Sequence, residues 1–212
     1  MRLARRTALG VLGAALMPVH AQARKLTIAA ASDLRFALDE AMRAFRAVHA
    51  DARIEVVYGS SGKLATQIRH GAPFDVFLSA DREFADALHR DGFAAGAPRL
   101  YARGHLVAWS TDASLGRLPL ADLVRDARVQ RFAIANPEHA PYGRRAVEAL
   151  RSQGQWDAVQ PKLVLGENIA QAVQFVQTGA AQAGLVALSL VLAPALAGKG
   201  AYTRVPEAWH SP

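Results

Sequence analysis

Apolar residues follow two different spacings that alternate along most of the chain. Short continuous runs, such as Leu26–Ala31 and Ile54–Gly59, are typical of buried strands. Between them, residues 33–49 form an amphipathic stretch with apolar residues at helical spacing, namely Leu34, Ala37, Leu38, Ala41, Met42, Phe45 and Val48. This alternation predicts an α/β fold in which mostly parallel sheets are covered by helices.

The same rhythm continues and then breaks once. A second helix is predicted over residues 63–70, a buried strand over 75–79, and a third helix that Asp81 caps and Gly92 ends. Two extended segments then follow with no helix between them. We interpret this break as a crossover between lobe 1, residues 24–103, and lobe 2, residues 104–204. The two extended segments are residues 100–103 and 105–109. The strands and helices predicted for lobe 2 after them are residues 120–124, 131–135, 141–153, 162–165, 167–177, 184–187 and 189–196.

The first 23 residues have the composition of a secretory signal. Three arginines precede an apolar stretch, residues 9–19, which is shorter than the roughly 20 residues that span a bilayer. Ala-Gln-Ala at residues 21–23 gives a small-x-small cleavage site. We therefore expect a signal peptide over residues 1–23 and an exported mature chain that begins at Arg24.

Composition argues against several classes of protein. The chain has no cysteine, so neither a disulfide framework nor a lipid-bearing cysteine is expected. The formal net charge is +7, but three of those charges lie in the predicted signal and the other arginines are scattered, so we expect no nucleic-acid partner. The seven histidines show no metal-binding spacing, and no glycine-rich nucleotide loop follows a strand. We expect no metal cation and no cofactor.

Four strand-to-helix corners carry unusual residues. Parallel α/β sheets bind ligands at the carboxyl ends of their strands, where helices begin. A serine there offers a hydroxyl beside backbone N–H groups that have no partner in the helix. We predict that Ser32 is the N-cap of the first helix and that corners of this kind form a cage of neutral donors for a small oxyanion. The four corners are Ser32, residues 60–62, residues 137–143 and residues 166–169.

Each corner also has a simpler interpretation. Ser32 could be an ordinary cap, the glycine-rich corner a plain turn, and Ile169 a core residue. Glu138 and His139 could form an acid/base pair, although neighbours in a turn more simply orient the loop. A secreted hydrolase that uses Ser32 or Ser61 with His139 stays open as an alternative, although the chain has no Gly-x-Ser-x-Gly motif.

Six stretches match, in order and spacing, the periplasmic molybdate-binding proteins of ABC importers. They are AAASDL at 29–34, YGSSGKL at 58–64, GAPFDVFLSAD at 71–81, NPEHAPYG at 136–143, GENI at 166–169 and GLVA at 184–187. The chain therefore resembles this family over essentially all of its length after the predicted signal.

The resemblance implies two α/β lobes of the type II periplasmic-binding fold with an oxyanion held between them. Ser32 and Ser61 would each give a hydroxyl and a backbone amide, and Tyr142 and Ile169 would each give a backbone amide. These four residues would bind molybdate or tungstate as an oxyanion, not as a bare cation. The implied protein is a periplasmic monomer without enzymatic activity that serves a membrane ABC permease.

The sequence departs from the family at two places. Some members donate a tyrosine hydroxyl from the position of Ala187, so either Tyr142 turns inward to replace that donor or the site has one hydrogen bond fewer. Family members also continue past the equivalent of Pro212, and we expect residues 205–212 to begin the return crossover to lobe 1.

Other ligands and classes stay open. Sulfate and a small carboxylate are alternatives. Phosphate is another, for which Asp33 is the only nearby acceptor of the proton that phosphate carries at neutral pH. The effector-binding lobes of a transcription regulator are a further alternative, which the predicted export signal argues against.

Overall fold

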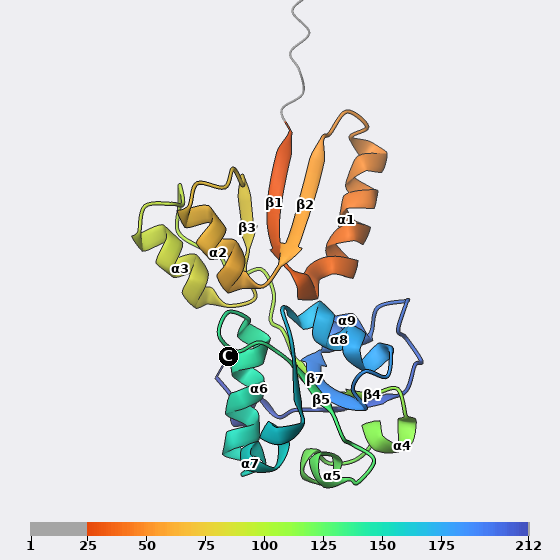
Figure 1. The fold of residues 1–212 in the computed structure, drawn as a ribbon. Coiled ribbons are helices and arrows are strands. Elements are labelled where there is room, and N and C mark those ends of the chain that lie inside the picture. Colours follow the sequence, from red (N-terminus) through yellow and green to blue (C-terminus); the bar gives the residue numbers. More distant parts are fainter. Residues whose placement is uncertain (1–24, 212) are drawn as a thin grey trace, which may run out of the picture.

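Two sheets divide the chain into two lobes in this computed structural model, which describes residues 25–211 (Figure 1). The predicted signal, residues 1–23, lies outside the described residues. Lobe 1 is built on a three-stranded parallel sheet in the order β2-β1-β3. Its elements are β1 (Leu26–Ala31), α1 (Arg35–Val48), β2 (Ile54–Gly59), α2 (Ser61–Arg69), β3 (Val76–Leu78) and α3 (Arg82–Arg90), with the short 3-10 helix η1 (Ser32–Leu34) after β1.

Lobe 2 is built on a five-stranded sheet in the order β6-β5-β7-β4-β8. Strands β6, β5 and β7 are parallel, whereas β4 runs antiparallel to both β7 and β8, so this sheet is mixed. The strands are β4 (Leu106–Ser110), β5 (Phe132–Ala135), β6 (Leu163–Gly166), β7 (Ala183–Ala187) and β8 (Ala201–Arg204). The helices are α4 (Ala113–Gly116), α5 (Leu120–Arg125), α6 (Pro141–Ser152), α7 (Trp156–Val159), α8 (Ile169–Gln177) and α9 (Leu188–Val191), with 3-10 helices η2 (Gln160–Lys162) and η3 (Glu207–Trp209).

Most predicted elements form, and the exceptions have local causes. Asp81 caps α3 as predicted, because its carboxylate accepts the Glu83 amide at 2.6 Å. Residues 100–103 form no strand, since they link the two sheets and Leu100 is 75 % exposed. The helix predicted over 189–196 is limited to α9, which continues into turns. Among residues 25–211, no helix has the length and apolar character needed to cross a membrane.

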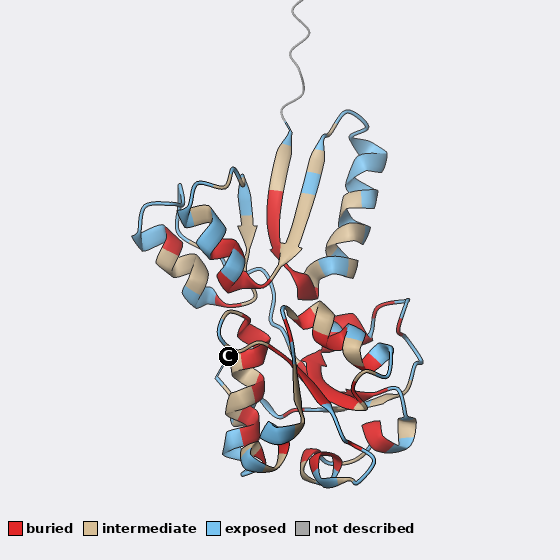
Figure 2. Ribbon diagram, viewed as in Figure 1, coloured by how far each residue is buried: buried red, intermediate tan, exposed pale blue. Residues whose placement is uncertain are grey.

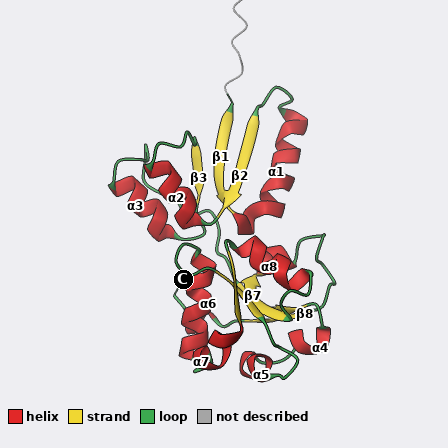
Figure 3. Cartoon of the chain, viewed as in Figure 1, coloured by secondary structure: helices red, strands yellow, loops and turns green. Residues whose placement is uncertain are grey.

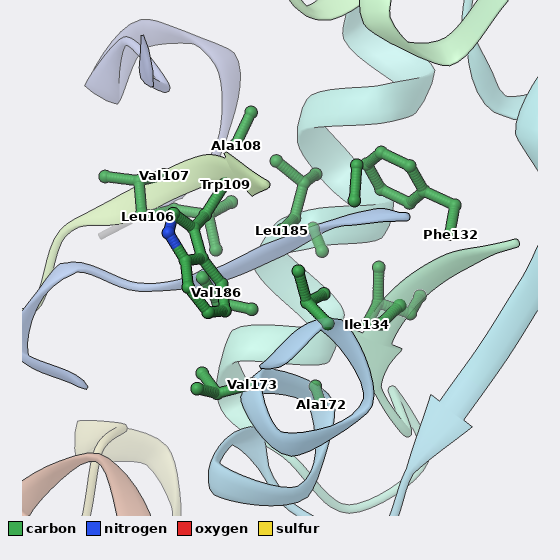
Figure 4. Close-up of a cluster of buried hydrophobic side chains, with 14 of the residues drawn as sticks. Leu106, Val107, Ala108, Trp109, Phe132, Ile134, Ala172, Val173, Leu185 and Val186 are labelled. Atoms are coloured by element: carbon green, nitrogen blue, oxygen red, sulfur yellow. The ribbon is translucent and has the colours of Figure 1, made fainter. Parts of the chain in front are cut away.

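The apolar core lies mainly in lobe 2 (Figures 2 and 4). Strands β4 and β7 are buried at every residue, and the side chains of Trp109, Phe132 and Leu185 are fully buried between the sheet and its helices. The indole N–H of Trp109 donates to the Lys199 carbonyl at 3.0 Å, so the core holds no unpaired indole donor there. Lobe 2 therefore forms a well-packed base for the helix starts that it contributes to the site.

The last described residues lie against lobe 2, beside α6 (Figure 3). The backbone and hydroxyl of Ser211 both donate to the Glu148 carboxylate, at 2.7 and 2.6 Å. The return crossover predicted over residues 205–212 stays a prediction.

Lobe 1 is much less buried than lobe 2, and we expect it to open first. None of the 14 residues of α1 is buried, and Val48 is 78 % exposed. Because few apolar contacts hold α1 in place, its amides and those of β2 should exchange with deuterium well before those of β4, β5 and β7. Hydrogen exchange followed by mass spectrometry measures this order. Equal protection in the two lobes would contradict it.

Candidate oxyanion-binding site

A small pocket of about 10 Å³ lies where the two lobes meet. Ser32, Ser61, Tyr142 and Ile169, the four residues predicted from the sequence, all line it. That volume is room for little more than one water molecule and is far below the roughly 300–1,000 Å³ of sites for larger organic ligands, so only a ligand of very few atoms fits between the lobes as they stand. The complete lining consists of Ala31, Ser32, Asp33, Gly59, Ser60, Ser61, Ala80, Ala140, Pro141, Tyr142 and Ile169.

Each of the four predicted residues stands at the beginning of a helix. Ser32 opens η1, Ser61 opens α2 and Ile169 opens α8, while Tyr142 follows Pro141 at the start of α6. At such positions the backbone N–H has no acceptor in its own helix. The longer helices also place the positive end of their dipoles there. Amides from both lobes are therefore available to one small anion.

The Ser61 hydroxyl is oriented by lobe 1. Its Oγ accepts the amide of Ala80 at 3.0 Å, and the side chain is fully buried. A hydroxyl oxygen that accepts in this way keeps its own hydrogen for another acceptor. Ser61 can therefore donate to a ligand without losing its contact with Ala80.

The Ser32 hydroxyl reaches across to lobe 2. It donates to Asn168 Oδ1 at 3.1 Å and accepts the amide of Ala170 at 3.3 Å. The prediction that Ser32 caps the first helix is therefore wrong: Ala31 precedes η1, with no side-chain cap, and α1 begins only at Arg35. The reason is that the Ser32 side chain is used at the start of α8 instead of at its own helix.

Asn168 lies beside the pocket, in the corner at residues 166–169 that the sequence indicated, but no role was predicted for its side chain. It is the N-cap of α8, where its Oδ1 accepts the Gln171 amide at 3.1 Å as well as the Ser32 hydroxyl. An asparagine directly before an apolar helical run is a typical cap signal, so the sequence could have predicted that Asn168 caps α8. The sequence could not have predicted its contact with Ser32, which belongs to the other lobe.

Further contacts hold the two lobes together around the pocket. The Ser60 hydroxyl lies 2.9 Å from His139 Nδ1, and the Gly62 amide donates to the His139 carbonyl at 2.9 Å. Three ion pairs also join the lobes, Asp81–Arg145 at 3.1 Å, Glu83–Arg144 at 3.0 Å and Lys63–Glu167 at 3.0 Å. The structure is thus a closed arrangement of the lobes.

The arrangement of His139 does not match the alternative of a secreted hydrolase. The serine within reach of this histidine is Ser60, not Ser32 or Ser61. The contact uses Nδ1, which is the nitrogen that a Ser-His-Asp triad turns toward its carboxylate. Burial and the nearby Lys63 lower the pKa of His139. The residue joins the lobes, in keeping with the interpretation that it orients its loop.

Tyr142 and Asp33 form a buried pair in the wall of the pocket. The Tyr142 hydroxyl donates to Asp33 Oδ2 at 3.3 Å, and the two residues are 7 % and 8 % exposed. Burial raises the pKa of Asp33 to about 6, against the opposing effects of its hydrogen bonds. Burial and the Asp33 charge raise the pKa of Tyr142 well above its usual value. Ala187, which has no side-chain donor, is buried at the end of β7.

The pocket holds no basic side chain. No lysine or arginine is among its lining residues. Within residues 25–211, no group of three histidine, aspartate or glutamate side chains could hold a metal ion. The donors available to an anion are therefore hydroxyls and backbone amides, which are neutral.

Residues 26–212 match the family model of bacterial extracellular solute-binding proteins. The chain belongs to this family. The solute-binding protein is 39 % identical over 162 residues to the molybdate-binding protein ModA of Rhodobacter capsulatus, covering 75 % of this chain and 62 % of that relative. It is 37 % identical over 202 residues to ModA of Azotobacter vinelandii, covering 95 % of this chain and 79 % of the relative. The chain thus spans about three fifths to four fifths of the length of these relatives.

A solved structure supports the same assignment of fold. The periplasmic molybdate-binding protein of Azotobacter vinelandii superposes on this solute-binding protein with a TM-score of 0.82 at 29 % identity, covering 89 % of this chain and 82 % of that one. The two-lobed α/β fold of the type II periplasmic-binding proteins, expected from the sequence, is confirmed, and so is the resemblance to molybdate-binding proteins.

Proposed function

We propose that this solute-binding protein captures molybdate, or the similar anion tungstate, in the periplasm and delivers it to a membrane ABC permease. The observation that carries the proposal is the pocket between the lobes, which four helix starts surround and no basic side chain enters. The relatives named above are molybdate-binding proteins, which supports the choice of ligand.

Recognition by neutral donors suits a protein that must release its ligand. Hydrogen bonds to an anion are stronger than those between neutral groups, and a dry pocket strengthens them further. Ser61 would give a hydroxyl and an amide, and Ser32, Tyr142 and Ile169 would each give an amide. The Ser32 hydroxyl would join them when its hydrogen turns from Asn168 Oδ1 to the anion. No counter-charge then holds the anion in place when the lobes separate.

The position of the pocket also explains how a permease could distinguish loaded from empty protein. A ligand that contacts both lobes at once favours the closed arrangement over an open one. The permease would recognise the closed form and would receive the anion when the lobes part. Binding without chemical change is sufficient for this role, so we propose no enzymatic activity.

Thermal melting with four anions tests the ligand. A ligand present at 100 times its Kd stabilises the folded state by about 2.7 kcal/mol. We expect molybdate and tungstate to raise the Tm of the mature protein by several degrees, and sulfate and phosphate to leave it unchanged. A rise with sulfate or phosphate alone would replace the proposed ligand, and no rise with any of the four would reject the proposal.

A further inference from the structure

The strongest unexplained feature of the pocket is the carboxyl group of Asp33. Asp33 lines the pocket and is 8 % exposed. Its Oδ2 accepts the Tyr142 hydroxyl, and the amide of Asp33 itself lies near enough to lower the pKa of the carboxyl group. Its Oδ1 is buried and has no hydrogen bond of good geometry among the described residues. Buried polar atoms are normally paired, so an unpaired one in a ligand pocket points to a partner that arrives with the ligand.

An ionised Asp33 would oppose the binding of a dianion. The carboxylate and the anion would share a small pocket that contains no basic side chain, and like charges repel strongly where water is excluded. A neutral carboxyl group removes the repulsion and carries one hydrogen that it can donate. The same group can therefore hinder the anion or hold it, depending on one proton.

We propose that Asp33 binds the oxyanion as a neutral carboxylic acid, with Oδ1–H donating to an anion oxygen while Oδ2 still accepts from Tyr142. The proton is taken up from water when the anion binds and returns to water when it leaves. This inference rests on the proposed function and deepens it, because it makes anion capture a proton-coupled step.

The hydrogen bond between Tyr142 and Asp33 also bears on Ala187, where the resemblance predicts that a donor hydroxyl is missing. The Tyr142 hydroxyl has a single hydrogen, and Asp33 accepts it. Tyr142 therefore cannot give that hydrogen to the anion at the same time. Asp33 in its neutral form supplies the additional donor, next to Ser32 in the chain and in the same pocket wall.

The groups around Asp33 leave it as the main titrating residue of the pocket. Tyr142 on α6 and Tyr101 on the segment between the sheets face it, and both have raised pKa values. Helices α8 and α9 pack against η1 and carry no ionisable side chain. Arg35 follows at the start of α1. Nearer the Ser60 side of the pocket, His139, Lys63 and Glu167 lie within electrostatic range of one another.

The direction of the pH effect follows from the pKa of Asp33. Burial raises this pKa to about 6 in the protein without ligand, and an adjacent anion must raise it further. Below about pH 6 the carboxyl group is already neutral, so affinity is constant there. Above pH 6 each binding event takes up a proton, and affinity falls by up to tenfold per pH unit until the pKa of the complex is reached.

Calorimetry of the mature protein with molybdate, from about pH 5.5 to 8.5 and in two buffers of different ionisation enthalpy, tests the inference. We expect wild type to lose affinity above about pH 6 and to take up close to one proton near pH 7.5. Asp33→Asn keeps a neutral donor without titrating, so its affinity should lack this loss and should exceed that of wild type at pH 8.5 by about tenfold or more. Asp51→Asn, an exposed aspartate in a turn, should match wild type.

The outcomes separate this inference from the proposed function. His139 is still present in Asp33→Asn. Any pH dependence of the affinity that is due to this histidine therefore appears in the variant as well, and it can be subtracted from the pH dependence of wild type. Molybdate binding with equal pH profiles in wild type and Asp33→Asn, or without proton uptake by wild type, would overturn the role of Asp33 and leave the proposed function intact. Proton uptake is measured on wild type and so does not depend on the folding of a variant. No molybdate binding at any pH would overturn both.

Discussion

Replacing Ser32 or Ser61 by alanine is expected to weaken molybdate binding by about ten- to a hundredfold in each case. Both residues line the pocket and are at most 3 % exposed. The Ser61 hydroxyl keeps its hydrogen for the anion, and the Ser32 hydroxyl supplies its hydrogen when it turns from Asn168 Oδ1 to the anion. Loss of a hydrogen bond to a charged group typically costs about 1.5–3 kcal/mol, and about 1.4 kcal/mol is a factor of ten in Kd. Calorimetry at one fixed pH measures the change directly.

The two variants differ in what else they disturb. Ser61→Ala also leaves the Ala80 amide without its acceptor, whereas Ser32→Ala removes the links to Asn168 and Ala170. Melting of both variants without ligand therefore separates a loss of stability from a loss of binding. Ser152→Ala, at the exposed end of α6, is the matched control and should bind like wild type. Unchanged affinity in both pocket variants would reject their assignment as ligand donors.

The sequence was sufficient for the fold and for the composition of the pocket wall. Buried β-runs such as Leu26–Ala31 and the amphipathic stretch after them have different periods, so their alternation identified two α/β lobes. The antiparallel place of β4 between β7 and β8 in the second sheet was not visible in that alternation. The rule that ligands bind where helices follow strands then selected four corners. The structure brings residues of all four, including Ser32 and Ile169, into one pocket.

The sequence was insufficient where a side chain's role depends on residues far away in the chain. The cap assigned to Ser32 was locally reasonable, but its hydroxyl is used by Asn168, 136 residues later. The sequence analysis named Asp33 as a possible acceptor for the proton of phosphate. It could not show that Asp33 is buried, because that burial depends on the packing of Tyr142, 109 residues away. No local pattern carries such contacts, because they form only when the second lobe closes on the first.

Closure itself depends on a position where only glycine fits. Gly62 lies in the first turn of α2, and its amide donates to the His139 carbonyl of the other lobe at 2.9 Å. A Cβ atom added there would lie 2.7 Å from that carbonyl oxygen and 3.0 Å from the His139 Cα. Both are backbone atoms, so they cannot move aside as a side chain would. The third neighbour, the Phe84 ring of α3 in lobe 1 at 3.0 Å, is a side chain and can shift.

We therefore expect Gly62→Ala to weaken molybdate binding by about tenfold or more while lobe 1 stays folded. Alanine suits a helix better than glycine, so the variant should not melt earlier on account of α2, but overpacking at an interface typically costs about 1–3 kcal/mol in the closed form. Calorimetry gives the affinity, and small-angle scattering with saturating molybdate should show a larger radius of gyration than for wild type. Gly96→Ala, where an added Cβ meets nothing within 4 Å, is the control for both measurements. If Gly62→Ala bound molybdate as tightly as Gly96→Ala does, the contact of α2 with His139 would have no part in holding the lobes closed on their ligand.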